Sequence, residues 1–301
     1  MKRKYVKTSI RSAFACWVVA VALSGEPAPA ADWGIDLSAG ISSDDNLSNA
    51  FEAADRKADT AATLDLAAGL HHEIRPGTNL GLNFMTESTT YMRYSGLSNL
   101  GLGVRGQVRH KFGVGAAAPW MAVSVTALHR DFHDDNRDGW HYDGGLSAGK
   151  RLDERWSVHA IARYDRYVAD EHQPQVIPGL SSAVYDVSGR SIGAGASLLA
   201  TEADTVSVNA WWRNGSVTSV THPDFEVLEY SDAAVRDTVF GPNGIAYRIH
   251  ATTMIFSLNW NRVLSPGVAV NLGYAYRRSD SDSEIGAYYA NLFNLSVTYS
   301  P

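Results

Sequence analysis

The sequence predicts an all-β protein: a single transmembrane, up-and-down antiparallel β-barrel of about twelve strands. Three observations support this prediction. Apolar and polar residues alternate with a period of two along most of the chain. The alternating segments exceed the usual strand length of about five or six residues. The connections between them alternate between tight turns and longer loops, a pattern typical of membrane barrels.

The N-terminal segment has the features of a secretory signal peptide. Five basic residues precede the apolar stretch 13–23, and Ala28-Pro29-Ala30 provides the small residues that signal peptidase requires. The apolar stretch is too short for a membrane-spanning helix, which needs about 20 residues. We therefore predict a cleaved signal peptide over residues 1–30 and one barrel domain over residues 31–301.

The predicted mature chain is acidic and contains no cysteine. Removing residues 1–30 takes five basic residues and one acid from totals of 26 and 32, which leaves 21 basic and 31 acidic residues and a net charge of −10. Nucleic acid is therefore not an expected partner, because phosphate binding requires a basic surface. Cys16 lies in the signal, so disulfides cannot stabilise the domain, whereas a closed hydrogen-bond ladder can.

The alternation defines the strands in chain order. In residues 60–74, Leu64 and Leu66 fall on one face, and Thr63 and Asp65 fall on the other. Each predicted strand approaches or exceeds the 9–11 tilted residues, roughly, that span a bilayer. The predicted strands lie at 33–43, 60–74, 79–93, 99–112, 119–131, 140–151, 155–168, 185–200, 204–215, 246–263, 267–279 and 287–300.

The connections and the aromatic residues predict the orientation of the barrel. An even number of strands places both termini on the rim with short turns, which is periplasmic in bacterial barrels. The tight turns are 75–78, 152–155, 201–204 and 264–267, and the long segments are 44–59, 132–139, 169–184 and 216–245. Aromatic residues near strand ends are expected to form interfacial girdles, among them Trp33, Trp120, Trp140, Trp156, Trp212 and Trp260.

A secreted β-sandwich or propeller is the alternative fold. Such proteins also alternate, but their apolar face points inward. Strand length, the asymmetry of the loops and the lack of an internal sequence repeat favour the barrel.

The last strand carries a resemblance to a known class. Residues 288–301, YYANLFNLSVTYSP, resemble the C-terminal strand of bacterial outer-membrane β-barrel proteins, although Ser300 and Pro301 follow the terminal aromatic residue Tyr299. The whole predicted domain resembles that class in pattern. The resemblance implies location in the bacterial outer membrane, contact with outer-membrane lipid and lipopolysaccharide, and recognition of this strand by the barrel assembly machinery.

Some barrels of this class are lipid hydrolases, but the sequence offers no convincing nucleophile and base. Ser124 and His129 share a strand with opposite parity and therefore face opposite sides. Ser147 and His141 share parity but are six residues apart, roughly 20 Å at the rise of a strand. We therefore predict no catalytic residue, with a lipid-modifying enzyme as the weaker alternative.

Two segments suggest metal binding without providing a full ligand set. His71 and His72 are adjacent in a strand and so point to opposite faces. Residues 134–139 match the opening of a calcium loop, but its twelfth position is Gly145 instead of a bidentate glutamate. A polar turn is the favoured interpretation, and we predict neither metal nor cofactor. Calcium-dependent ordering of this loop is the alternative.

The segment 214–243 is the longest connection. Loops of this length are usually functional or disordered. Two hypotheses are equal at this stage: a constriction folded into the lumen, or a surface flap. Ser231 is a candidate N-cap for a short helix within the segment.

The polar strand faces predict a lumen in which basic residues outnumber acids. Arginine and lysine in a pore favour anions, whereas arginine–carboxylate pairs would plug a small lumen. Eight strands are filled by side chains and sixteen leave a channel, so twelve strands permit either outcome. The predicted pore-lining residues are Asp65, Glu87, Arg105, Arg109, Lys111, Arg163, Arg213 and Arg277.

These observations lead to three functional hypotheses. The first is a narrow, porin-like channel for small solutes, in particular anions. The second is a non-conducting structural or assembly barrel of an export or surface-polymer system. The third is an outer-membrane lipid-modifying enzyme.

Overall fold

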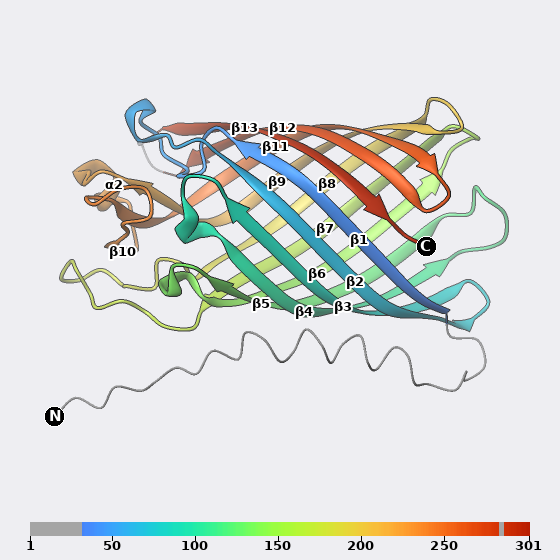
Figure 1. Cartoon of the computed structure of the whole chain (residues 1–301), viewed down its shortest axis with the longest axis horizontal. Coiled ribbons are helices and arrows are strands. Elements are labelled where there is room, and N and C mark those ends of the chain that lie inside the picture. Colours follow the sequence, from blue (N-terminus) through green and yellow to red (C-terminus); the bar gives the residue numbers. More distant parts are fainter. Residues whose placement is uncertain (1–31, 283–285) are drawn as a thin grey trace.

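A computed structural model describes residues 32–282 and 286–301 as an antiparallel barrel with one additional short strand. The predicted signal peptide lies outside the described residues. Figure 1 shows long tilted strands wrapped around one axis. The barrel strands are β1 (Asp32–Asp44), β2 (Asp59–Arg75), β3 (Thr78–Tyr91), β4 (Asn99–Lys111), β5 (Trp120–Phe132), β6 (Gly139–Arg151), β7 (Trp156–Ala169), β8 (Val187–Leu199), β9 (Asp204–Thr221), β11 (Ile245–Ser265), β12 (Val268–Ser281) and β13 (Ala287–Tyr299).

The hydrogen-bond ladder closes on itself. Neighbouring strands pair in chain order, β13 pairs with β1 from Leu37↔Tyr299, and β9 pairs with β11. The thirteenth strand, β10 (Ala233–Arg236), pairs with β11 alone and stands outside the ring. The predicted closed antiparallel barrel of twelve strands is therefore confirmed, and β10 was not predicted.

The exterior of the barrel is apolar. Alternate residues of each strand project large hydrophobic side chains outward, and these are exposed instead of buried. Examples are Leu64, Phe84, Val125, Ile192, Phe256 and Phe293, each at least half exposed. A β-sandwich or propeller would bury this face, so the structure contradicts that alternative. An apolar outer band is what strands facing lipid require.

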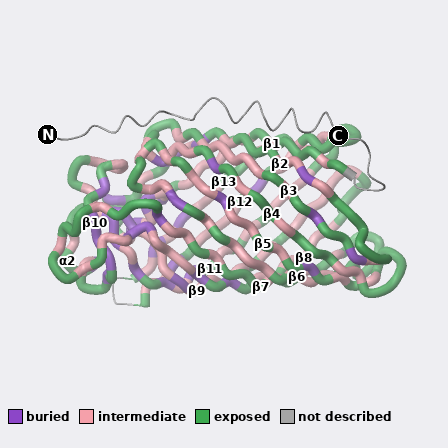
Figure 2. Tube along the Cα trace, turned by 90° about the horizontal axis from the view of Figure 1, so that it is seen from below, coloured by how far each residue is buried: buried purple, intermediate pink, exposed green. Residues whose placement is uncertain are grey.

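The two ends of the barrel differ. At one end, here called the turn end, the connections are 76–77, 112–119, 152–155, 200–203 and 266–267. The first described residue of β1 and the C-terminus also lie there (Figure 1). At the other end, here called the loop end, the connections include 45–58, 92–98, 133–138, 170–186 and 222–244. Buried residues gather at the loop end (Figure 2).

β9 extends beyond its predicted end at the loop end, whereas β11 begins there within one residue of its predicted boundary. β9 was predicted to end at 215 and continues to Thr221, paired with Ile245 of β11. β8 leaves the pairing at Gly189↔Gly215, so the extension is a two-stranded ribbon to which β10 adds a third strand. The sequence did not predict this extension, because the extended segment does not have one polar and one apolar face.

The predicted helix with Ser231 as its N-cap is wrong. The helix in this segment is α2 (Phe225–Glu229), and its N-cap is Asp224, whose carboxylate accepts hydrogen bonds from the N–H groups of Glu226 and Val227. Ser231 follows the helix and donates to the carbonyl of Val227. Residues 233–236 then pair with β11, because the ladder satisfies more backbone groups than a cap does. No helix of the described residues is long and apolar enough to cross a membrane.

The closed ladder predicts heat modifiability. A barrel with every strand paired resists detergent at room temperature, because no open edge offers a place for unfolding to begin. We expect the mature chain to migrate differently on a denaturing gel before and after boiling. Identical migration of the two samples would contradict the barrel.

Candidate functional site

All eight predicted pore-lining residues lie on the inward face of their strands. Asp65, for example, alternates with Leu64 and Leu66 of the exterior, and it stands opposite Glu87 in the register of β2 and β3. This placement follows from the period of two in each strand. Whether these residues contact a passing solute stays a prediction.

Four of the eight form ion pairs with residues on other strands. Glu87 binds Arg130 at 3.0 Å, and Arg163 binds Asp143. Arg213 of β9 reaches over β8 to Asp165 of β7, with N–O distances of 2.8 and 3.2 Å. Gly189 of β8 allows this reach, since a Cβ there would lie 2.4 Å from the Arg213 guanidinium carbon.

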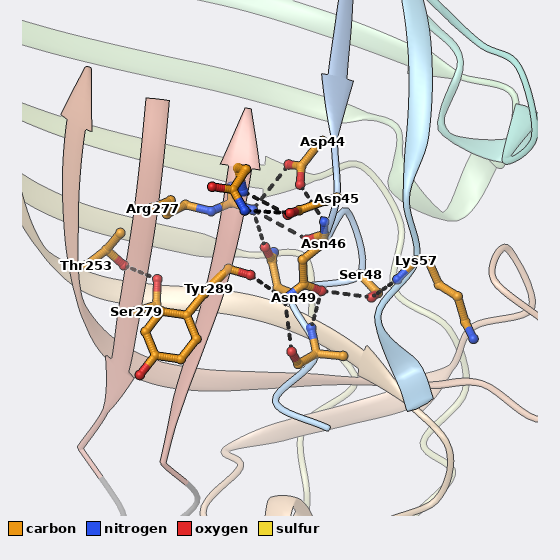
Figure 3. A network of polar contacts seen from close by, with 12 residues as sticks. Asp44, Asp45, Asn46, Ser48, Asn49, Lys57, Thr253, Arg277, Ser279 and Tyr289 are labelled. Atoms are coloured by element: carbon orange, nitrogen blue, oxygen red, sulfur yellow. Dashed lines mark hydrogen bonds and ion pairs between the residues drawn. The ribbon is translucent and has the colours of Figure 1, made fainter. Parts of the chain in front are cut away.

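Arg277 forms the fourth pair and anchors a loop (Figure 3). Its Nη2 donates to Asp44 Oδ2 at 3.2 Å, to the carbonyl of Asn46 at 3.4 Å and to Asn49 Oδ1 at 3.0 Å. Asn46 Nδ2 in turn donates to the carbonyl of Tyr289 at 3.0 Å. These contacts hold the start of the loop 45–58 against β12 and β13.

The three remaining cations follow one another on β4. Arg105 Nε donates to Thr126 Oγ1 at 3.2 Å, and the Arg109 guanidinium lies 4.4 Å from the ring centroid of Trp120. Within residues 32–282 and 286–301, no carboxylate forms an ion pair with Arg105, Arg109 or Lys111. β4 therefore carries a line of uncompensated positive charge that runs toward the turn end.

The described residues line a cavity near each end of the barrel. The loop-end cavity, about 550 Å³, is lined by paired charges that include Glu87, Arg130, Asp165 and Arg213. The turn-end cavity, about 670 Å³, is lined by Arg109 and Lys111 together with side chains from the turns. Charge in the lumen is thus neutralised near the loop end and basic near the turn end.

The longest connection lies across the mouth of the loop end. It leaves the barrel between β9 and β11, yet its Phe240 packs on Tyr94 of the connection between β3 and β4, with ring centroids 4.9 Å apart. The β9–β11 junction and the β3–β4 junction lie on opposite sides of the ring, because six strands separate them in one direction (β4 to β9) and six in the other (β11 to β3). The segment therefore spans the full mouth. It is neither of the two predicted arrangements, the lumenal constriction and the surface flap.

The segment belongs to a packed structure, here called the mouth cap, formed by residues 45–58, 170–186 and 216–249. Both faces of the β9–β11 extension are buried in it. One face, with Val220 and Ala246, packs on Val184 and Tyr185. The other face packs on residues of both neighbouring loops, and its members are Val217, Tyr247 and Ile249 with Val227 and Phe51. Because both faces of this ribbon are buried against other side chains, close packing fixes its position, and the cap is a folded element.

A buried ion pair ties the mouth cap to the barrel rim. Asp237 of the cap, with its side chain 0% exposed, pairs with Arg137 from the connection between β5 and β6. Asp237 also accepts a hydrogen bond from the Tyr185 hydroxyl at 2.9 Å. Burial raises the pKa of Tyr185 well above its usual range, so the hydroxyl keeps the proton that it donates. Burial acts to lower the pKa of Arg137, but Tyr185 and Asp237 outweigh it and the pKa is raised.

The candidate catalytic and metal residues are not brought together. Ser124 and His129 lie on opposite faces of β5, and Ser147 and His141 are on one face of β6 at the predicted separation. The possible calcium segment forms a short 3₁₀ turn, in which Asp134 Oδ1 accepts from Asn136 and Asp138 Oδ1 accepts from the N–H of Phe132. Among the described residues, no cluster of three or more potential metal ligands occurs.

Several residues of the lumen were not predicted. Arg130, Asp143 and Asp44 neutralise predicted pore residues, and Trp120 faces the turn-end cavity instead of an interfacial girdle. Two of these residues, Arg130 and Trp120, lie on β5. They were missed because the inward positions of β5 include the apolar Trp120 and Leu128, so the strand shows no clear polar face. Parity counted from Thr126 would have placed Arg130 inward.

Comparisons with known proteins find a likeness of fold. No family model and no curated protein matches the chain. Among solved structures, the COG4313 outer membrane channel from Pseudomonas putida F1 is 12% identical, with a TM-score of 0.54 over 92% of this chain and 100% of that one. The outer membrane channel DcaP of Acinetobacter baumannii is 9% identical, with a TM-score of 0.44 over 93% and 100%. The likeness to the P. putida protein supports the barrel architecture over 92% of this chain.

Proposed function

We propose that this protein is an outer-membrane channel for small solutes that favours anions. The observation that carries the proposal is the line of Arg105, Arg109 and Lys111 inside a closed barrel, for which the described part of the chain provides no carboxylate partner. Uncompensated positive charge in a narrow, partly desolvated lumen attracts anions and repels cations. The paired arginines near the loop end add little net charge.

Location in the outer membrane is part of the proposal. The apolar exterior band, the predicted signal peptide and the placement of the described termini at one end agree with it. In this orientation the turn end faces the periplasm and the loop end faces outward. Lipopolysaccharide would surround the outer rim, and the assembly machinery would recognise β13. The P. putida structure with the similar fold is described as an outer membrane channel, which supports the same assignment.

The mouth cap implies a gated path. With the cap folded, a solute entering from the loop end meets the dry interface around Val220 and Tyr185 before it reaches the loop-end cavity. Passage therefore requires the cap to move or a small solute to pass at its edge. We expect low conductance in the closed state.

Reversal potentials in planar bilayers test the proposal. The purified mature chain should give discrete conductance steps with a preference for chloride over potassium. The triple variant Arg105→Gln, Arg109→Gln and Lys111→Gln should lose most of that preference, because it removes the uncompensated charges and keeps side chains of similar length. Absence of steps, both in the intact chain and after deletion of the cap segment 224–243, would refute the channel.

The matched control removes three charges from the exterior. Arg166 and Arg190 lie on the outward faces of β7 and β8, and Arg262 lies on β11 near the turn end. Their replacement by glutamine changes the net charge by the same amount as the lumenal triple variant. We expect the ion preference to be unchanged, and an equal loss in both triple variants would show that the lumenal line is not responsible.

A non-conducting structural barrel is the second candidate function, and the mouth cap favours it. A folded cap held by a buried ion pair closes one end, which a purely structural or assembly component would tolerate. Deletion of the segment 224–243 separates the two candidates, since only a channel gains conductance when the obstruction is removed.

A further inference from the structure

We propose that the turn-end cavity is a binding site for a small polyvalent anion, a molecule that carries two or more carboxylate or phosphate groups. The inference rests on the proposed function, because the site lies on the path of a solute through the barrel. Beyond the proposed function, it assigns a binding site at the turn end of the path and a chemical class of ligand. Four steps lead to it.

Arg109 is held in position by aromatic stacking. Its guanidinium lies 4.4 Å from the Trp120 ring centroid, a cation–π contact that directs the cation along the cavity wall. Trp120 can lie there only because its cross-strand neighbour Gly149 has no side chain. A Cβ at Gly149 would lie 2.6 Å from Trp120 Cζ2. Three residues on three strands thus place one cation before any ligand arrives.

The turn 152–155 adds further positive charge with fixed geometry. Arg151 Nε donates to the carbonyl of Asp153 at 2.9 Å, and Nη2 donates to the carbonyl of Glu154. The carbonyl acceptors orient the guanidinium and are themselves neutral, although the Asp153 carboxylate also interacts with Arg151 and Arg155. Arg155 also lines the cavity.

The acids of the turn compensate this charge only in part. Asp153 Oδ1 accepts the backbone N–H groups of Arg155 and Trp156 at 2.8 and 2.7 Å, which lowers its pKa and turns that oxygen toward the backbone. Among the described residues that line the cavity, Glu154 is the one carboxylate, against the inward cations Arg109, Lys111 and Arg151 and the turn residue Arg155, whereas Lys150 lies on the outward face of β6. The site therefore has a strong excess of positive charge.

The size and the charge of the cavity select the ligand. A volume of about 670 Å³ lies within the range of small-molecule sites, roughly 300–1,000 Å³, and far exceeds what one chloride ion needs. Cations contributed by separate strands and a turn can each meet a different anionic group. A ligand with several such groups gains one charge-assisted hydrogen bond per contact, whereas a monovalent anion gains one in all.

Calorimetric titration of the detergent-solubilised barrel tests the site directly, without any current. Citrate and pyrophosphate are the two probes, and acetate is the monovalent comparison. We expect either polyvalent probe to bind at least about tenfold more tightly than acetate, the equivalent of one additional charged hydrogen bond. Preference for citrate or for pyrophosphate identifies carboxylates or phosphates as the natural groups. Equal affinity for acetate and both probes would overturn the proposal.

Four variants test the assigned residues. Arg109→Gln with Lys111→Gln should weaken citrate and pyrophosphate binding about tenfold or more, and Gly149→Ala should weaken it severalfold by displacing Trp120. Glu154→Gln should strengthen binding, because it removes the opposing charge. Arg262→Gln, at the same end but paired with Asp204, should leave the affinity unchanged. Unchanged affinity in the double variant would refute the site, and the heat-dependent gel shift shows that each variant is folded.

The bilayer measurement separates this proposal from the proposed function. Citrate added from the turn end should reduce chloride current at lower concentration than citrate added from the loop end, because the site opens at one end. A barrel that binds citrate but gives no current would refute the channel and retain the site. A barrel that conducts chloride with no binding of either probe would refute the site alone.

Discussion

Asp237→Asn is expected to open the mouth cap and to increase single-channel conductance severalfold. The substitution removes the negative charge that Arg137 contacts in a fully buried position, where Tyr185 also donates to the carboxylate. Removing one partner of a buried ion pair typically costs about 3–5 kcal/mol. Arg137 would keep only its longer contact with Asp134, at 3.5 Å, so its charge would be poorly compensated. A cost of that size shifts a folded loop toward its open state. Conductance in planar bilayers measures the change.

The same segment provides the control. Asp232 pairs with Arg248, but its side chain is 68% exposed, and exposed pairs contribute only about 0–1 kcal/mol. Asp232→Asn should therefore leave the conductance unchanged. A second measurement is limited trypsin digestion from the loop end, which should become faster in Asp237→Asn because Arg137, whose side chain is largely buried in the closed cap, becomes accessible. Equal conductance and equal digestion of the two variants would contradict the gating role of the cap.

Arg277→Met is expected to destabilise the barrel and to release the loop 45–58. Arg277 contacts Asp44, Asn46 and Asn49 while its side chain is only 20% exposed (Figure 3). The substitution preserves most of the apolar volume but leaves Asp44 without its cation, again with a cost of about 3–5 kcal/mol. Urea unfolding of the barrel in lipid vesicles should show a lower midpoint, and protease should cut within 45–58 sooner.

The adjacent residue gives a matched comparison. Arg278 is on the same strand and pairs with Asp280, but both side chains are more than 40% exposed. Arg278→Met should shift the unfolding midpoint little. If the two methionine variants unfold at the same urea concentration, Arg277 does not anchor the loop.

The period of two was enough to predict most of the architecture. In a barrel each strand has one apolar and one polar face, and both faces are visible in any stretch such as 60–74 because successive side chains alternate. Strand number and the antiparallel order follow from this pattern and from the lengths of the connections. On β5, Trp120 and Arg130 were missed because the inward face of that strand is partly apolar.

The pairing of charges could not be predicted because it depends on register and on neighbours two strands apart. Arg213 meets Asp165 only because Gly189 lies between them, and no local feature of either strand indicates this contact. Which lumenal cations lack a carboxylate partner also depends on neighbouring strands. Arg109 and Arg163 are equivalent in the sequence pattern, but one lies over Trp120 and the other is neutralised by Asp143.

The sequence by itself determined that this chain forms a closed barrel with an apolar exterior and a charged interior, because alternation is a local property of each strand. The tertiary structure decided which end of the lumen is basic and that the longest connection spans the mouth. Both depend on contacts between residues far apart in the chain, such as Arg137 with Asp237 and Tyr94 with Phe240. Such contacts form only when the ring of strands has closed and has brought opposite walls to a common rim.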